Sequence, residues 1–69
     1  MKISNSVPAC KKLNGWIELK GLSIGATAEH FGVSRQAVYR WLSGKPPRLS
    51  VMASIKEETG IPVGDWVER

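Results

Sequence analysis

The 69-residue sequence predicts an all-α fold, a small bundle of about five short helices. Three observations predict it. Apolar residues recur at intervals of three and four, as they do on one face of a helix. Serine or proline precedes several of these segments and glycine follows them, which are the residues preferred where helices begin and end. Apolar and polar residues nowhere alternate over a stretch long enough to predict a strand.

The first predicted helix begins near Ser6 and Pro8, because serine caps helices and proline fits their first turn. Its inner face is marked at helical spacing by Cys10, Leu13, Trp16, Ile17 and Lys20. Gly21 ends it. Residues 1–7 are predicted to be a flexible N-terminal tail, with a strand over 2–7 that pairs across a dimer as the alternative. Residues 8–69 then form a single domain.

The next two predicted helices follow each other closely. One covers 24–31, after the capping residue Ser23, and ends at Gly32. Only Val33 then precedes a third helix over 34–43. That spacing leaves room for a tight turn and no more.

The C-terminal part carries two further helices. A stiff basic connection, Lys45-Pro46-Pro47-Arg48, leads into a helix that Gly60 ends. The inner face of that helix is marked by Leu49, Met52, Ala53 and Ile55. Pro62 opens a short last helix with Val63, Trp66 and Val67. We expect Trp41, Trp66, Met52 and Cys10 to lie in the core.

Charge is distributed unevenly along the chain, whose formal net charge is +4. Residues 1–48 hold eight Lys or Arg against two Glu, a net charge of +6. Residues 49–69 hold two basic against four acidic residues, a net charge of −2. A basic front and an acidic back suit a domain that binds a polyanion with one face.

The predicted third helix has two unlike sides. With about 100° of rotation per residue, four apolar side chains share one arc of about 140°. They are Ala37, Val38, Trp41 and Leu42. The opposite side carries Arg35, Gln36, Tyr39 and Arg40, with no acidic residue among them. A merely solvated helix would mix Glu with Lys. The alternative is that Arg35 and Arg40 pair with Glu29 or other acids.

That polar side has the chemistry of base recognition. A glutamine can present an acceptor and a donor together to adenine, and an arginine can place two donors on guanine. Helix N-terminal amides near Ser23 and Ser34 can receive phosphate oxygens. Lys45 and Arg48 follow the helix, where they can neutralise phosphates.

Residues 23–44, SIGATAEHFGVSRQAVYRWLSG, resemble a helix-turn-helix of the phage Cro and repressor type. The matching pattern is Ala28, Gly32, Val38 and Trp41. The closing segment IPVGDWV also resembles the last turn of that family, so the likeness covers residues 10–67. The resemblance implies a lambda-repressor-like DNA-binding domain.

By resemblance, the helix from Ser34 to Ser43 is the recognition helix that lies in the major groove. The residues implied to touch bases are Arg35, Gln36, Tyr39 and Arg40, with Tyr39 shared between base and phosphate. The residues implied to touch the DNA backbone are Ser23, Ser34, Lys45 and Arg48. Weaker candidates, because their helix is expected to face away, are Lys11, Lys12 and Lys20.

Two residues depart from the family pattern. Thr27 stands where the family usually has a larger apolar residue, so the helix that carries it is expected to pack loosely. Gly25 stands where many relatives carry glutamine, so a side-chain contact to phosphate is expected to be absent there.

Enzymatic function is not expected. The chain has one histidine, His30, which is interpreted as a surface residue, and one aspartate, Asp65. Glu57 and Glu58 are neighbours on a helix and therefore diverge. With Cys10 as the only cysteine, neither a disulfide within the chain nor a cysteine metal cluster is expected. We expect no metal, cofactor or small-molecule ligand.

The sequence therefore predicts a DNA-binding transcriptional regulator, a Cro-like phage repressor. The expected partner is a double-stranded, pseudo-palindromic operator, bound by a weak homodimer. Apolar residues proposed for the pairing surface are Pro47, Leu49, Val63 and Val67. With neither a secretory signal nor a membrane span expected, the chain is predicted to be cytoplasmic.

Two other functions fit the same fold. One is an antitoxin or another protein-interaction module, which a co-purifying partner would reveal. The other is a phage excision or recombination accessory factor, which would bend DNA.

Overall fold

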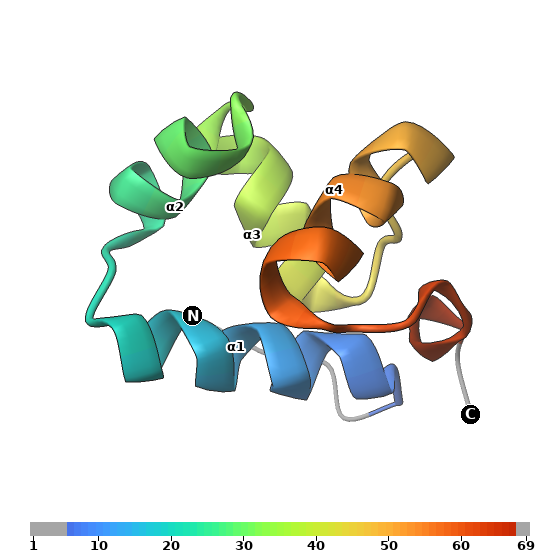
Figure 1. Cartoon of the computed structure of the whole chain (residues 1–69). Helices are drawn as coiled ribbons and strands as arrows, with labels where there is room; N and C mark the ends of the chain where they lie inside the picture. Colours follow the sequence, from blue (N-terminus) through green and yellow to red (C-terminus); the bar gives the residue numbers. More distant parts are fainter. Residues whose placement is uncertain (1–5, 68–69) are drawn as a thin grey trace.

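The computed structural model describes residues 6–67. Its helices, in chain order, are α1 (Pro8–Lys20), α2 (Ile24–Phe31), α3 (Arg35–Ser43) and α4 (Leu49–Thr59), followed by the 3-10 helix η1 (Val63–Trp66) (Figure 1). The described residues contain no strand, so the all-α prediction is confirmed. The predicted tail and its alternative strand fall mostly on residues 1–5, outside the described residues. Val7, at the end of that segment, is buried in the core.

The ends of α2 and α3 lie where the sequence predicts them. Ser23 Oγ accepts a hydrogen bond from the Ala26 amide at 3.0 Å, and Ser34 Oγ accepts one from the Ala37 amide at 3.2 Å. Gly32 ends α2 with φ +67°, a left-handed conformation that strains any residue with a Cβ atom. The short link between two capped helices makes the turn tight.

The start of α1 differs from the prediction. Pro8 is the first helical residue, as expected, but the capping position belongs to Val7 and not to Ser6. No side chain caps this end. The burial of Val7 and the packing of α1 hold the first turn in place instead.

A single core joins all the elements. Its fully buried members include Leu13 from α1, Val38 and Leu42 from α3, and Ile55 from α4. The predicted core residues Cys10, Trp41, Met52 and Trp66 are also buried, which confirms those predictions. In Figure 1, α1 runs along one side of the molecule while α2 and α3 lie opposite it. Contacts between α1 and α3, among them the hydrogen bond from the Cys10 thiol to the Trp41 carbonyl, join the buried side of α3 to α1.

Thr27 packs tightly, contrary to the expectation of loose packing. Its side chain is fully buried, and its hydroxyl donates a hydrogen bond to the Ser23 carbonyl at 2.9 Å. Because the polar group is satisfied within α2 itself, burying it leaves no unpaired donor. Thr27 therefore packs in the core without an unsatisfied hydroxyl.

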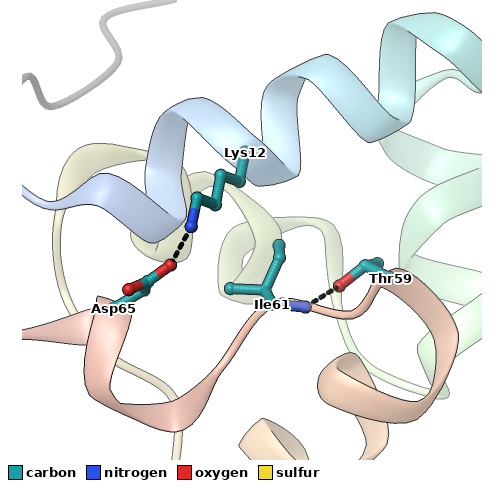
Figure 2. A network of polar contacts seen from close by, with 4 residues as sticks. All are labelled: Lys12, Thr59, Ile61 and Asp65. Carbon is teal, nitrogen blue, oxygen red and sulfur yellow. Dashed lines mark hydrogen bonds and ion pairs between the residues drawn. The ribbon is translucent and has the colours of Figure 1, made fainter.

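The C-terminal segment closes over α1. Lys12 on α1 and Asp65 on η1 form an ion pair, as Figure 2 shows. In the connection before η1, the Ile61 amide donates a hydrogen bond to Thr59 Oγ1 at 3.2 Å. Asp65 and Trp66 are buried, so this segment covers one end of the core, as the sequence predicts.

An aromatic cluster joins α1, α2 and α3. Trp16 is half-buried, with its ring centroid 5.7 Å from that of His30 and 5.9 Å from that of Phe31. Phe31 in turn meets Trp41 edge-on at 5.9 Å. His30 is exposed, as predicted, and its Nε2 lies 3.0 Å from a Glu58 carboxylate oxygen. These contacts hold the helix-turn-helix against the rest of the bundle.

The thiol of Cys10 links α1 to the end of α3. It is fully buried and donates a hydrogen bond to the Trp41 carbonyl at 2.9 Å. Burial raises the pKa of this thiol above its ordinary value of 9.0, because desolvation disfavours the thiolate. We therefore expect thiol reagents to modify Cys10 much more slowly in the native protein than in denaturant.

The same pKa shift predicts a pH dependence of stability. The folded state holds the Cys10 proton to higher pH than the unfolded chain does, so this contribution is complete below pH 9.0 and declines above it. Chemical denaturation across this range should show a steeper loss for the wild type than for Cys10→Ala. Equal losses in the two proteins would contradict the assignment.

Candidate nucleic-acid interface

Helix α3 presents one polar side to solvent. Arg35, Gln36, Tyr39 and Arg40 are all exposed, with Tyr39 at 46%. Val38, Trp41 and Leu42 are buried on the opposite side, and Ala37 is half-buried between the two. The two unlike sides therefore lie as the helical periodicity predicts.

Packing fixes α3 from behind. Val38 and Leu42 are fully buried, and Trp41 is held both by Phe31 and by the hydrogen bond from Cys10. At its start, the Ser34 cap sets where the helix begins. The exposed polar side chains thus project from a helix whose position is fixed by packing. Recognition of base edges, which have fixed positions in a DNA groove, requires such a support.

Within residues 6–67, neither arginine of α3 forms an ion pair with an acidic residue. Among residues 6–67 the ion pairs are Lys12 with Asp65 and His30 with Glu58. The alternative in which Arg35 or Arg40 pairs with Glu29 is therefore not found there. No acid in the described part of the chain neutralises either guanidinium group, and both residues are exposed.

One flank of α3 borders a groove that is lined by three cationic residues. The groove has a volume of about 680 Å³ and is lined by Arg40, Lys45 and Arg48, among others. Trp41 and the buried Pro47 also line it. No acidic residue among those described lines the groove. The fold thus brings the connection after α3 next to the polar side of the helix.

The other flank of α3 meets the start of α2. The Arg35 side chain lies against Gly25, so that a Cβ atom placed on Gly25 would be 3.1 Å from Arg35 Nε. Ser23, which caps α2, is exposed and stands two residues before Gly25 in the sequence. Gln36 and Tyr39 lie on α3 between the two flanks.

Three predicted candidates are not brought to this side. Lys11 and Lys20 are exposed on α1, the helix that packs against the buried side of α3. Lys12, on the same helix, is engaged with Asp65. These lysines were the weaker candidates in the sequence for the same reason.

Two residues of this surface were not predicted. Ser43 is exposed at the end of α3, and its hydroxyl donates to the Arg40 carbonyl at 2.9 Å. For Gly25 the sequence predicts only a missing contact, whereas in the structure the Arg35 side chain packs against it. A glycine inside a helix is less stable than alanine and can mark such a close approach, but Gly15 carries the same signal and a Cβ atom there would meet nothing within 4 Å.

Residues 6–67 contain neither a metal site nor a membrane-spanning helix. No group of three or more His, Cys, Asp or Glu side chains there could hold a metal ion. None of the helices in that range has both the length and the apolar character needed to cross a membrane.

Comparison with known proteins gives one match. Residues 16–44 match the family model described as a helix-turn-helix domain. The matched region runs from within α1 to the glycine that ends α3, so it includes the α2–turn–α3 unit. The searches of curated proteins and of solved structures each found no match. The helix-turn-helix match suggests that the chain binds DNA.

Proposed function

We propose that this protein is a sequence-specific transcriptional regulator, a Cro-like repressor that binds a double-stranded operator. The observation that carries the proposal is the polar side of α3. It combines Arg35, Gln36, Tyr39 and Arg40, contains no acid and stands on the second helix of a helix-turn-helix. Long hydrogen-bonding side chains on a rigid helix fit the width and the donor–acceptor pattern of the major groove.

In the proposed complex, α3 lies in the major groove. Gln36 pairs with an adenine through its amide, and Arg40 places two donors on a guanine. Tyr39 contacts a base or a phosphate. The contacts to the DNA backbone that fix the register come from Ser23, Ser34, Lys45 and Arg48.

Useful specificity requires two copies of the helix, because one recognition helix reads only a few base pairs. We propose a weak homodimer on a pseudo-palindromic operator with half-sites about 34 Å apart. Of the apolar residues expected to form the pairing surface, Pro47 is buried and is excluded. Leu49 is 73% exposed, Val63 38% and Val67 65%, and these remain the candidates. Occupying a promoter is then sufficient for repression.

Selection from a random library of double-stranded DNA tests the proposal. We expect a two-fold-symmetric consensus that binds far more tightly than random DNA at several salt concentrations. Binding that is weak, sensitive to salt and blind to sequence would contradict the proposal. A co-purifying protein would then point to an interaction module, and strong DNA bending to a recombination accessory factor.

Lys45→Ala is expected to weaken binding to all DNA sequences alike. Its ammonium group borders the groove beside α3 and is proposed to neutralise a phosphate, which carries no sequence information. The slope of log K against log salt should become shallower by about 0.9. Titrations of selected and random DNA at several salt concentrations measure both effects.

Lys11→Ala is the matched control for Lys45→Ala. It removes the same charge from α1, which packs on the buried side of α3. We expect little change in the salt slope for this variant. Equal changes in the two variants would mean that only net charge matters and would contradict the docking.

A further inference from the structure

We propose that Gly25 is a positioning residue for Arg35, and that the guanidinium it accommodates contacts a DNA phosphate and not a base edge. This role rests on the proposed DNA-binding function and deepens it. It reassigns Arg35, which the resemblance implies to be a base-reading residue.

The first step is the close approach between the two residues. A Cβ atom on Gly25 would lie 3.1 Å from Arg35 Nε, 3.2 Å from Nη2 and 3.4 Å from Cζ. Contacts at 3.1 and 3.2 Å are tighter than ordinary van der Waals separation, so an alanine would make the guanidinium shift by a few tenths of an ångström. The charged end of Arg35 therefore lies in close contact with the place where a side chain of α2 would begin.

The second step is that the backbone gives no reason for glycine at this position. Gly25 lies inside α2 and is not among the glycines with positive φ. In a helix, glycine is less stable than alanine. At Gly15, inside α1, a Cβ atom would meet nothing within 4 Å, so the contact with Arg35, and not glycine in a helix as such, is what assigns this role to Gly25.

The third step concerns direction. When a helix-turn-helix binds DNA, its first helix crosses the DNA backbone while the start of its second helix reaches base edges. Arg35 is the first residue of α3, but its guanidinium lies against α2, the first helix of the pair. In the bound complex, the Arg35 guanidinium would therefore lie next to the DNA backbone, which α2 crosses. Gln36, the next residue, is left to read the base.

Four variants test this assignment: Gly25→Ala, Arg35→Ala, Arg35→Lys and the double variant of the first two. Gly15→Ala is the matched control, because Gly15 is also helical and a Cβ atom there would meet nothing within 4 Å. We expect Gly15→Ala to bind DNA as the wild type does. Gly25→Ala should fold at least as stably as the wild type, since the atoms it displaces belong to a flexible side chain.

Arg35→Ala should lower the affinity for selected and random DNA by the same factor, about threefold or more, and reduce the salt slope by about 0.9. Gly25→Ala should also lower the affinities for selected and for random DNA. In the double variant it should cause no further loss of affinity beyond that of Arg35→Ala. Arg35→Lys should keep the salt slope, because lysine can bind phosphate as a point charge but cannot make the paired contacts of arginine to guanine.

A readout without DNA separates this inference from the proposed function. In NMR spectra of the free protein, the Arg35 Nε–Hε signal should shift in Gly25→Ala and stay in place in Gly15→Ala. An unshifted signal in Gly25→Ala would overturn the positioning role even if the protein binds DNA. A wild-type protein that binds no DNA would overturn the proposed function and with it the phosphate contact.

Two DNA-binding results would overturn the assignment while leaving the proposed function intact. In the first, Arg35→Ala relaxes the preference at one base pair and leaves the salt slope unchanged, so that Arg35 reads a base. In the second, the effects of Gly25→Ala and Arg35→Ala add fully in the double variant, so that Gly25 acts through another residue.

Discussion

Trp41→Ala is expected to lower the free energy of unfolding by about 3–5 kcal/mol, the usual range for truncating a buried tryptophan. Trp41 is 4% exposed and meets Phe31 edge-on at 5.9 Å. It fixes α3 within the core, so the cavity left by its removal lies under that helix. A domain of this size has a total stability of only about 3–10 kcal/mol. The variant should therefore be largely unfolded or close to it.

Thermal and chemical denaturation followed by far-UV circular dichroism measure this effect. Trp16→Ala is the comparison, because Trp16 is only half-buried and its removal should cost clearly less. Trp41→Phe keeps a ring in the core and should recover part of the loss. A loss below about 1 kcal/mol for Trp41→Ala would contradict the central packing role of this side chain.

Gln36→Ala is expected to weaken binding to the selected operator by about 1–3 kcal/mol and to relax the preference at one base pair. Its side chain is exposed on the polar side of α3, where its amide can give and accept a hydrogen bond with adenine. Removing it leaves the base edge without these partners. Binding to random DNA should change little, because Gln36 carries no charge.

Binding curves for operators substituted at each position measure the loss of preference. Denaturation of Gln36→Ala is the control for folding, and its midpoint should match that of the wild type because the side chain is exposed. Arg40→Ala should show a loss of similar size at a different base pair. Unchanged affinity and preference in Gln36→Ala would show that α3 does not dock as proposed.

Several tertiary contacts of the candidate site could not be predicted from the sequence. Arg40, Lys45 and Arg48 are close together in the sequence, but only the tertiary structure shows that they line one groove. Arg35 was expected to point to bases, and its position against Gly25 depends on how α2 crosses α3. Side-chain direction at such a crossing depends on the angle and spacing of two helices, which sequence periodicity does not encode.

The sequence by itself determined the helices and the two sides of α3. Ser23, Ser34 and Gly32 act through hydrogen bonds and backbone angles within one turn, so their effect is readable locally. The same holds for the 3.6-residue period that separates the buried from the exposed side of α3, whereas in α4 it misplaced Leu49 and Ala53, which are exposed.

Only the tertiary structure decided which side chains meet. Lys12 pairs with Asp65 and Cys10 donates to the Trp41 carbonyl across long separations in sequence. The approach of Arg35 to Gly25 is of the same kind. The physical reason is that local rules act over one turn of helix, whereas these contacts form only after the elements pack around a common core.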